Sequence, residues 1–188
     1  MKKNRSGSQW QWFSMMFTVL LLSIAGIAVH SEPTPKPSPT QSKTREGNAL
    51  ETHLQAFLNR WHQAASQADA QVYLGSLHEH AVFLGTDKTE RWSKPEFSRF
   101  TKTYFDQGKG WTYTPRERNI YFNQEKTTAW FDEKLSNAKY GDVRGSGVLL
   151  RTQAGWKIVQ YNLSFPIPNA VTKNVVKLIS EQTEAHPK

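Results

Sequence analysis

The sequence predicts an α+β domain in which helices pack against one curved antiparallel sheet. Two observations support this prediction. Large apolar residues recur at helical spacing in the first half of the domain, whereas residues 111–165 divide into four stretches rich in aromatic and β-branched side chains. Short turns separate these stretches, so consecutive strands should pair as an antiparallel meander, and helices followed by strands are typical of the α+β class.

Two helices are expected before the first strand, at residues 48–66 and 69–77, and each begins at a residue able to cap it. The first strand is expected at 81–84. A third helix follows and has the clearest signal, because Ser93 and Glu96 form a capping box with a proline in the first turn.

The meander occupies the second half of the chain. Its strands are expected at Trp111–Phe122, Thr127–Leu135, Val143–Gln153 and Trp156–Phe165. Pro166 and Pro168 end the last strand, and a terminal helix is expected after Asn169.

A basic amino terminus and an apolar run precede the domain. Lys2, Lys3 and Arg5 stand before residues 12–29, which contain few polar residues. This order is typical of a secretory signal peptide over residues 1–31, with an uncleaved membrane anchor as the alternative. We therefore expect a periplasmic or secreted protein, attached to the inner membrane if the segment is retained, with no other contact to a membrane.

The remaining boundaries follow from composition. Residues 32–47 are expected to form a Pro-rich, disordered spacer, residues 48–182 the domain and residues 183–188 a tail. Cysteine is absent, which excludes disulfides and a thiol nucleophile. The formal net charge is +8, but the basic residues are scattered, so we do not expect nucleic-acid binding.

Several local motifs resemble those of a known family. The blocks are Gly85–Trp92, Gly108–Tyr113, Ala129–Glu133, Arg144–Val148 and Gly155–Ser164. They resemble an exported group of SnoaL-like domains within the nuclear transport factor 2-like superfamily, and the resemblance covers almost all of the chain after the spacer. It implies a cone-like sheet curled around a pocket, a scaffold that serves isomerases, cyclases, dehydratases and binding proteins alike, so the fold does not by itself assign a function.

One candidate cluster lies between the first strand and the third helix, where pockets of this superfamily open. Asp87, Glu90, Arg91 and Trp92 place two carboxylates, a guanidinium and an indole within a short loop. These groups suit ligand contact, with Arg91 holding an anionic group. The structural alternative is a capped turn in which Trp92 packs against the start of the third helix.

A second candidate cluster lies on two neighbouring strands. Alternation puts Trp130 and Asp132 on one face and Glu133 on the other, so one carboxylate must point toward the helices. Arg144 on the next strand is its expected partner, and a structural salt bridge is favoured over a general base or a ligand anchor.

Glycines on both sides of Ser146 predict a bulge, a bend or a close approach by another group, and they do not form the elbow of a nucleophilic serine. On the last strand a polar row (Gln160, Asn162, Ser164) alternates with an apolar row that includes Tyr161. We favour the polar row as pocket lining, since related domains carry polar pocket residues there, and we expect Ser146, Tyr161 and Asn162 to contact the ligand.

The histidines do not point to a metal site. His62, His78 and His80 match no zinc-binding spacing, so we expect histidines in turns or on the surface and neither a metal nor a cofactor.

The function favoured by the sequence is binding of a small organic ligand, with no reaction assigned. The expected aromatic lining is Trp61, Trp92, Trp111, Trp130 and Tyr161. The first alternative is an isomerase, cyclase or hydro-lyase with Asp87 or Asp132 as base and Arg144, Asn162 or Tyr161 as donor. The second is an envelope interaction module that pairs through an apolar outer sheet face, and a homodimer is the expected assembly.

Overall fold

A computed structural model describes residues 39–185. The segment expected to be a signal peptide or an anchor (1–31), the first part of the expected spacer (32–38) and the end of the expected tail (186–188) lie outside the described residues. Within the described part, no helix has both the length and the apolar character needed to cross a membrane.

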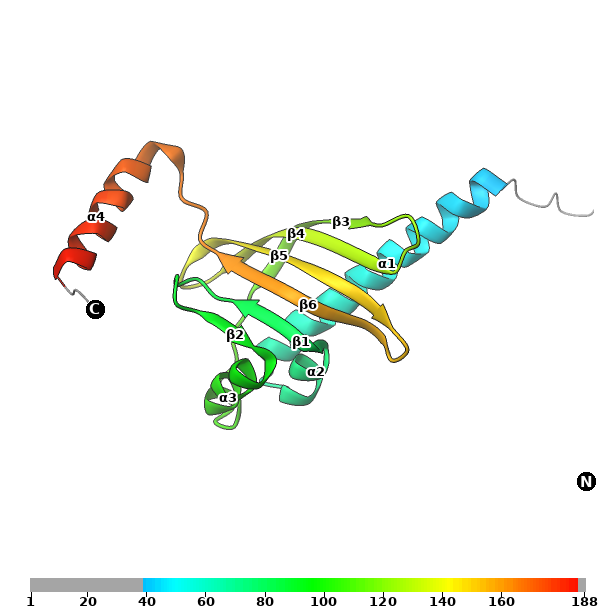
Figure 1. Cartoon of the computed structure of the whole chain (residues 1–188), viewed down its shortest axis with the longest axis horizontal. Coiled ribbons are helices and arrows are strands. Elements are labelled where there is room, and N and C mark those ends of the chain that lie inside the picture. The colour runs from blue at the N-terminus through cyan, green and yellow to red at the C-terminus, as the bar shows by residue number, and fades with distance from the viewer. Residues whose placement is uncertain (1–38, 186–188) are drawn as a thin grey trace, which may run out of the picture. The chain divides into compact units, whose positions relative to one another are not determined.

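The described chain consists of helices on one curved sheet, as Figure 1 shows, so the predicted α+β class is confirmed. In chain order its elements are α1 (Pro39–Ser66), α2 (Ala70–Gly75), β1 (Leu77–Leu84), β2 (Arg91–Ser93), α3 (Lys94–Phe105), β3 (Thr114–Phe122), β4 (Thr128–Asn137), β5 (Gly141–Thr152), β6 (Gly155–Ser164), the 3-10 turn η1 (Asn169–Val171) and α4 (Thr172–Ala185).

The six strands form one sheet in the order β2-β1-β6-β5-β4-β3. Strands β3 to β6 are the predicted antiparallel meander, and β1 runs parallel to β6. Strand β2 was not predicted because its three residues are too few to show alternation. It pairs antiparallel with β1, with Leu84 opposite Arg91, and so forms a hairpin at the edge of the sheet.

Helix α1 begins earlier than the sequence suggested. It starts at Pro39, so residues 39–47 are helical and not part of an extended spacer. Proline is well tolerated as the first residue of a helix because its missing N–H would have no partner there. Asn48 is therefore an interior residue of the helix, and its carbonyl accepts a hydrogen bond from the Thr52 hydroxyl at 2.9 Å.

The predicted starts of α2 and α3 are confirmed by their caps. The Asp69 carboxylate accepts from the backbone N–H of Val72 at 3.0 Å. The Glu96 carboxylate accepts from the backbone N–H of Ser93 at 2.8 Å and from its hydroxyl at 2.6 Å. These bonds satisfy donors that the first helical turn leaves without partners, and they fix where the two helices begin.

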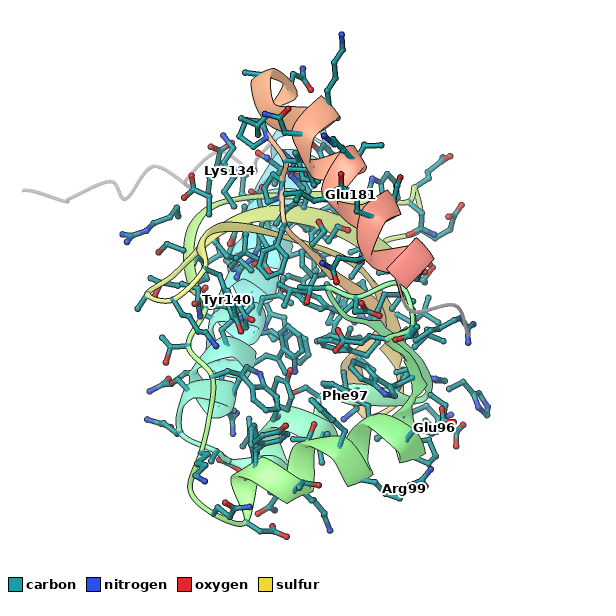
Figure 2. All side chains as sticks on the ribbon, turned by 90° about the vertical axis from the view of Figure 1, so that its left-hand side faces the viewer. Glu96, Phe97, Arg99, Lys134, Tyr140 and Glu181 are labelled. Carbon is teal, nitrogen blue, oxygen red and sulfur yellow. The ribbon has the colours of Figure 1, made fainter. Side chains whose placement is uncertain are left out.

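The core lies between the helices and one face of the sheet. Leu54, Leu58 and Trp61 of α1 are buried, as are inward-facing residues of the sheet such as Leu135 and Ile158. Figure 2 shows Phe97 on the inner side of α3, pointing toward this core, whereas Glu96 and Arg99 point away from it. The apolar spacing that predicted α1 and α3 is thus the spacing of their buried faces.

The predicted terminal helix is present as η1 and α4. Most of its large apolar residues are exposed, including Val176 (56%) and Leu178 (58%), and none of those described is fully buried. Unlike α1 and α3, this helix therefore buries no apolar face within the described chain.

Candidate functional site

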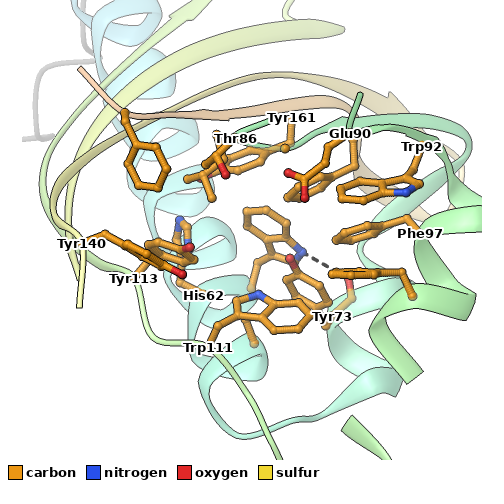
Figure 3. A pocket seen from close by; sticks show the side chains of 17 residues that line it. His62, Tyr73, Thr86, Glu90, Trp92, Phe97, Trp111, Tyr113, Tyr140 and Tyr161 are labelled. Atoms are coloured by element: carbon orange, nitrogen blue, oxygen red, sulfur yellow. Dashed lines mark hydrogen bonds between the residues drawn. The ribbon is translucent and has the colours of Figure 1, made fainter. Parts of the chain in front are cut away.

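One cavity of about 330 Å³ opens between the helices and the inner face of the sheet (Figure 3). Elements α1, α2, α3, β1, β2 and β6 and the segment after α3 contribute to its wall. Eleven of its lining residues are aromatic: Trp61, Tyr73, Phe83, Trp92, Phe97, Phe100, Trp111, Tyr113, Tyr140, Tyr161 and Phe165. The polar or charged lining residues are few, namely His62, Thr86 and Glu90.

The aromatic wall is held together by its own ring contacts. Phe83 and Phe97 stack with centroids 3.9 Å apart and planes 11° apart. Trp61 and Tyr73 stack at 5.0 Å and 10°, and the indole N–H of Trp61 donates to the backbone carbonyl of Tyr73 at 3.2 Å. Such contacts contribute about 0.5–1.5 kcal/mol per pair beyond the area that they bury. The wall is therefore preformed.

The Trp92 side chain has both of the roles considered from the sequence. Its ring lies 5.8 Å from that of Phe97 in the first turns of α3, which is the expected staple. It also lines the cavity and stacks on Phe100 at 4.9 Å. The structural and the ligand-contacting interpretations of this residue are compatible.

Behind the cavity, a buried carboxylate joins the sheet to α1. The Oε1 atom of Glu133 lies 2.8 Å from Nε2 of His62. The same oxygen accepts a hydrogen bond from the Tyr161 hydroxyl at 2.9 Å. Its Oε2 atom accepts a hydrogen bond from Nε of Arg118 at 2.8 Å, and Nη2 of Arg118 lies at the same distance from Oε2. Both oxygens are therefore occupied by groups from three different elements.

Arg118 is fixed in turn by α1. Its Nη1 donates to the side-chain oxygens of Gln55 and Asn59, each at 2.9 Å. The expected partner Arg144 is instead exposed, so the prediction of an Arg144 salt bridge was wrong. Strand β3, not β5, supplies the arginine because Arg118 lies opposite Glu133 in the β3–β4 register and on its face of the sheet.

The charge of Glu133 determines the role of His62. Burial by itself would raise the pKa of Glu133, but the hydrogen bond and charge of His62 and the charge of Arg118 hold it below its ordinary value. An ionised carboxylate only accepts, so Nε2 of His62 must donate. In the neutral imidazole, Nδ1 is then the acceptor, and the ring that carries it lines the cavity.

His62 is thus neither a surface nor a turn histidine, which corrects the expectation from sequence. It is 6% exposed, on the inner face of α1. Burial and the nearby Glu133 charge raise the pKa of Tyr161, so this hydroxyl stays a neutral donor.

Gly145 allows this network to close. A Cβ atom at this position would lie 2.6 Å from Oε1 of Glu133 and would collide with the Tyr161 hydroxyl. Of the three interpretations offered for the glycines around Ser146, the close approach applies to Gly145.

The β1–β2 hairpin brings one acidic group to the opposite side of the cavity. The backbone N–H of Gly85 donates to the Glu90 carbonyl at 2.8 Å, which closes the hairpin. Figure 3 shows the Glu90 carboxylate directed into the cavity beside Trp92. Its neighbour Asp87 is exposed and accepts from the N–H of Thr89 at 2.8 Å, so Asp87 has the turn-capping role.

The predicted site residues therefore divide into two groups. Glu90, Trp92 and Tyr161 line the cavity. The other predicted residues are not among its lining: Asp87, Arg91, Trp130, Asp132, Arg144, Ser146 and Asn162.

Several of the second group lie on the opposite face of the sheet. Trp130 is 46% exposed and stacks on Tyr121 at 6.0 Å, and Asp132 accepts from the Asn119 amide at 3.3 Å. The apolar row of β6 lines the cavity, so the preference for its polar row was wrong. The β5–β6 register shifts between Val148 and Leu149, an irregularity of the β-bulge type.

Four further aromatic residues of the lining were not among the predicted site residues. Phe97 and Phe100 belong to the apolar helical pattern of α3, which predicts packing. Tyr113 ends one of the blocks that resemble the family, but no feature marked its side chain as a cavity residue, and Tyr140 had no distinguishing pattern. Residues 46–182, whose side chains the structure describes, contain no group of three or more histidine or acidic side chains able to hold a metal ion.

Comparison with known proteins agrees with this architecture. Residues 54–168 match the family model of a SnoaL-like domain. No curated protein matches the sequence significantly.

Three solved structures illustrate the shared fold. An NTF2-like protein of unknown function from Pseudomonas putida aligns with a TM-score of 0.55 at 12% identity, over 65% of this chain and 90% of that one. An NTF2-like protein with a cystatin-like fold from Novosphingobium aromaticivorans gives 0.53 at 11%, over 76% and 99%. A provisionally named dehydratase of the NTF2-like family from Streptomyces avermitilis gives 0.56 at 11%, over 65% and 99%. These likenesses confirm the NTF2-like fold and carry no function with them.

Proposed function

The chain belongs to the SnoaL-like domain family, and we propose that its cavity binds a small, largely aromatic or apolar organic molecule. The observation that supports this function is the preformed aromatic wall around an open volume of about 330 Å³. Small-molecule sites typically measure roughly 300–1,000 Å³, are mostly apolar and contain a few placed polar groups. Here those groups are His62 and Glu90 on opposite sides of the cavity.

The test is binding of a neutral aromatic probe, naphthalene, followed by ligand-observed NMR. The wild-type protein should bind it saturably. Trp92→Ala removes a stacking surface in the cavity and should weaken binding by about tenfold. Trp130→Ala is the matched control, because this indole stacks on Tyr121 outside the cavity. Absence of saturable binding, or an equal loss in both variants, would argue against the proposal.

Proton transfer is a second candidate function. The Glu133–His62 pair supports it, since a buried carboxylate orients an imidazole that lines the cavity. The carboxylate bases expected from sequence, Asp87 and Asp132, do not line the cavity, so His62 takes their place in this hypothesis. To test it, mass spectrometry would measure whether bound ketones take up deuterium at the carbon next to the carbonyl. Uptake should disappear in His62→Gln, and unchanged uptake would exclude this role for His62.

The interaction-module alternative has less support. An interaction module of this kind pairs through an apolar outer sheet face, and a cavity filled by its own side chains would also favour it. Asp132 and Lys134 interrupt the outer face of β4 beside Trp130, and the cavity is open. We also propose that the protein is exported and forms a homodimer. The intact mass of the protein purified from its host envelope would test both: the mass under denaturing conditions tests export, and the mass under native conditions gives the number of subunits.

A further inference from the structure

We propose that the ligand carries a positively charged nitrogen, so that the cavity selects organic cations over neutral molecules of the same shape. This inference rests on the proposed binding function and specifies its ligand class. It starts from the charges around the cavity. Glu90 contributes the one carboxylate among the lining residues, and no lysine or arginine side chain lines the cavity.

The Glu90 carboxylate is held in place without a cation. Its Oε2 atom accepts the backbone N–H of Asp87 at 3.1 Å. Among residues 46–182, no lysine, arginine or histidine forms an ion pair with it. The negative charge on the cavity wall is therefore not neutralised by the described side chains.

The glycine at the start of the hairpin directs this carboxylate inward. A Cβ atom on Gly85 would collide with Oε2 of Glu90 and lie 2.9 Å from its Cβ atom. With hydrogen at that position, the Glu90 side chain packs closely against Gly85. Figure 3 shows its carboxylate directed into the cavity.

The field of Glu90 reaches the opposite wall. Burial, then Tyr140 and Glu90, raise the pKa of Tyr113, which faces the same cavity. Burial disfavours a charge of either sign at this wall, but the contribution of Glu90 depends on sign: it opposes a second negative charge and favours a positive one.

The aromatic rings add a second attraction of the same sign. The face of an aromatic ring is electronegative, and a cation within about 6 Å of its centre is attracted by roughly 0.5–2 kcal/mol, depending on desolvation. Trp92, which lies beside Glu90 in Figure 3, and Phe100, which stacks on it at 4.9 Å, belong to this aromatic lining. In the neutral form of the His62 ring, Nδ1 can accept a hydrogen bond from a donor of the same ligand. Arg118 lies behind the cavity wall, and its charge is already neutralised by Glu133.

The test compares two probes of nearly the same shape, the cation phenyltrimethylammonium and the neutral tert-butylbenzene, by NMR titration. The wild-type protein should bind the cation at least about tenfold more tightly. In Glu90→Gln this preference should fall below about threefold, while the affinity for tert-butylbenzene should stay the same. Glu51→Gln, an equal change of charge at an exposed position of α1, should keep the full preference.

A second variant tests how the carboxylate is placed. Gly85→Ala should displace the Glu90 side chain and lower the preference for the cation, although the residue at position 90 is unchanged. Equal binding of both probes to the wild-type protein would overturn the cation inference and leave the binding function standing. If neither probe bound to the folded protein, the proposed function itself would fail, and the inference with it.

Discussion

Glu133 and His62, 71 positions apart in sequence, meet at 2.8 Å behind the cavity. Glu133 lies on β4, next to the edge strand β3, and His62 lies on α1, so their hydrogen bond links the packing of the core to the orientation of a cavity side chain. The stability of the fold and the geometry of the site therefore depend on the same carboxylate.

Replacing this carboxylate should be costly. Glu133→Gln leaves Arg118 buried without its counter-charge, and removing one member of a buried pair typically costs about 3–5 kcal/mol. Urea unfolding measures the loss. Glu117→Gln makes the same change in the exposed pair with Lys134 on the same two strands, and there no measurable loss is expected. Similar losses in both variants would contradict the assigned burial.

The two arginines considered for the pair should differ in the same experiment. Arg118→Met strands the charge of Glu133 and should lower the free energy of unfolding by about 3–5 kcal/mol. Arg144→Met, at an exposed position, should change it by less than about 0.5 kcal/mol. A larger effect at Arg144 would restore the pairing inferred from the sequence.

Acid should reveal the low pKa of Glu133. Because its pKa is below the ordinary value in the folded protein, this group stabilises the fold above the unfolded-state pKa of about 4.3. That contribution is lost as the pH falls through the folded-state pKa. Unfolding free energies measured between neutral pH and strong acid should therefore decline less steeply in Glu133→Gln than in the wild type. Parallel curves would rule out this contribution.

Alkali should act through two buried tyrosines. Burial raises the pKa of both Tyr73 and Tyr161, whereas in the unfolded chain they ionise near pH 10. Their contribution to stability is complete below about pH 10 and falls as the pH rises above it, because the unfolded state loses these protons first. Tyr161→Phe should reduce the slope of this decline, measured by urea unfolding at several alkaline pH values. An unchanged slope would indicate that Tyr161 does not contribute.

The close approach at Gly145 can be tested with a single methyl group. Gly145→Ala should destabilise the protein by about 1–3 kcal/mol, since the new Cβ atom would press on Glu133 and Tyr161. Gly75→Ala is the control, because a Cβ atom there would meet no atom within 4 Å. Thermal unfolding of both variants distinguishes this collision from a general intolerance of alanine, which would lower both midpoints alike.

Local signals were enough to predict most of the fold. Caps at Asp69 and Ser93, together with apolar periodicity, located the helices and the meander, because these features act within a few residues. The early start of α1 and the strand β2 were missed. A proline run resembles a spacer whether or not a helix follows it, and three residues show no period.

The site was harder to predict, because it depends on the face of the sheet and on register. Sequence alternation separated Glu133 from Asp132 but did not indicate which of them faced the helices or that Arg118 lies opposite Glu133. The pairing of His62 with Glu133 likewise depends on how α1 crosses the sheet. By contrast, Glu90 and Trp92 were identified because they lie in the loop where related pockets open.

The β1–β2 hairpin lies at one edge of the sheet and contributes Glu90 to the cavity, while the Glu133–Arg118 ion pair joins β4 and β3 at the other edge. Substitutions at position 90 should therefore leave the Glu133–Arg118 ion pair intact. In evolution, or in protein engineering, ligand preference can therefore change within a few hairpin residues without a compensating change in the core. A scaffold arranged in this way can diversify its ligands while its interior stays constant.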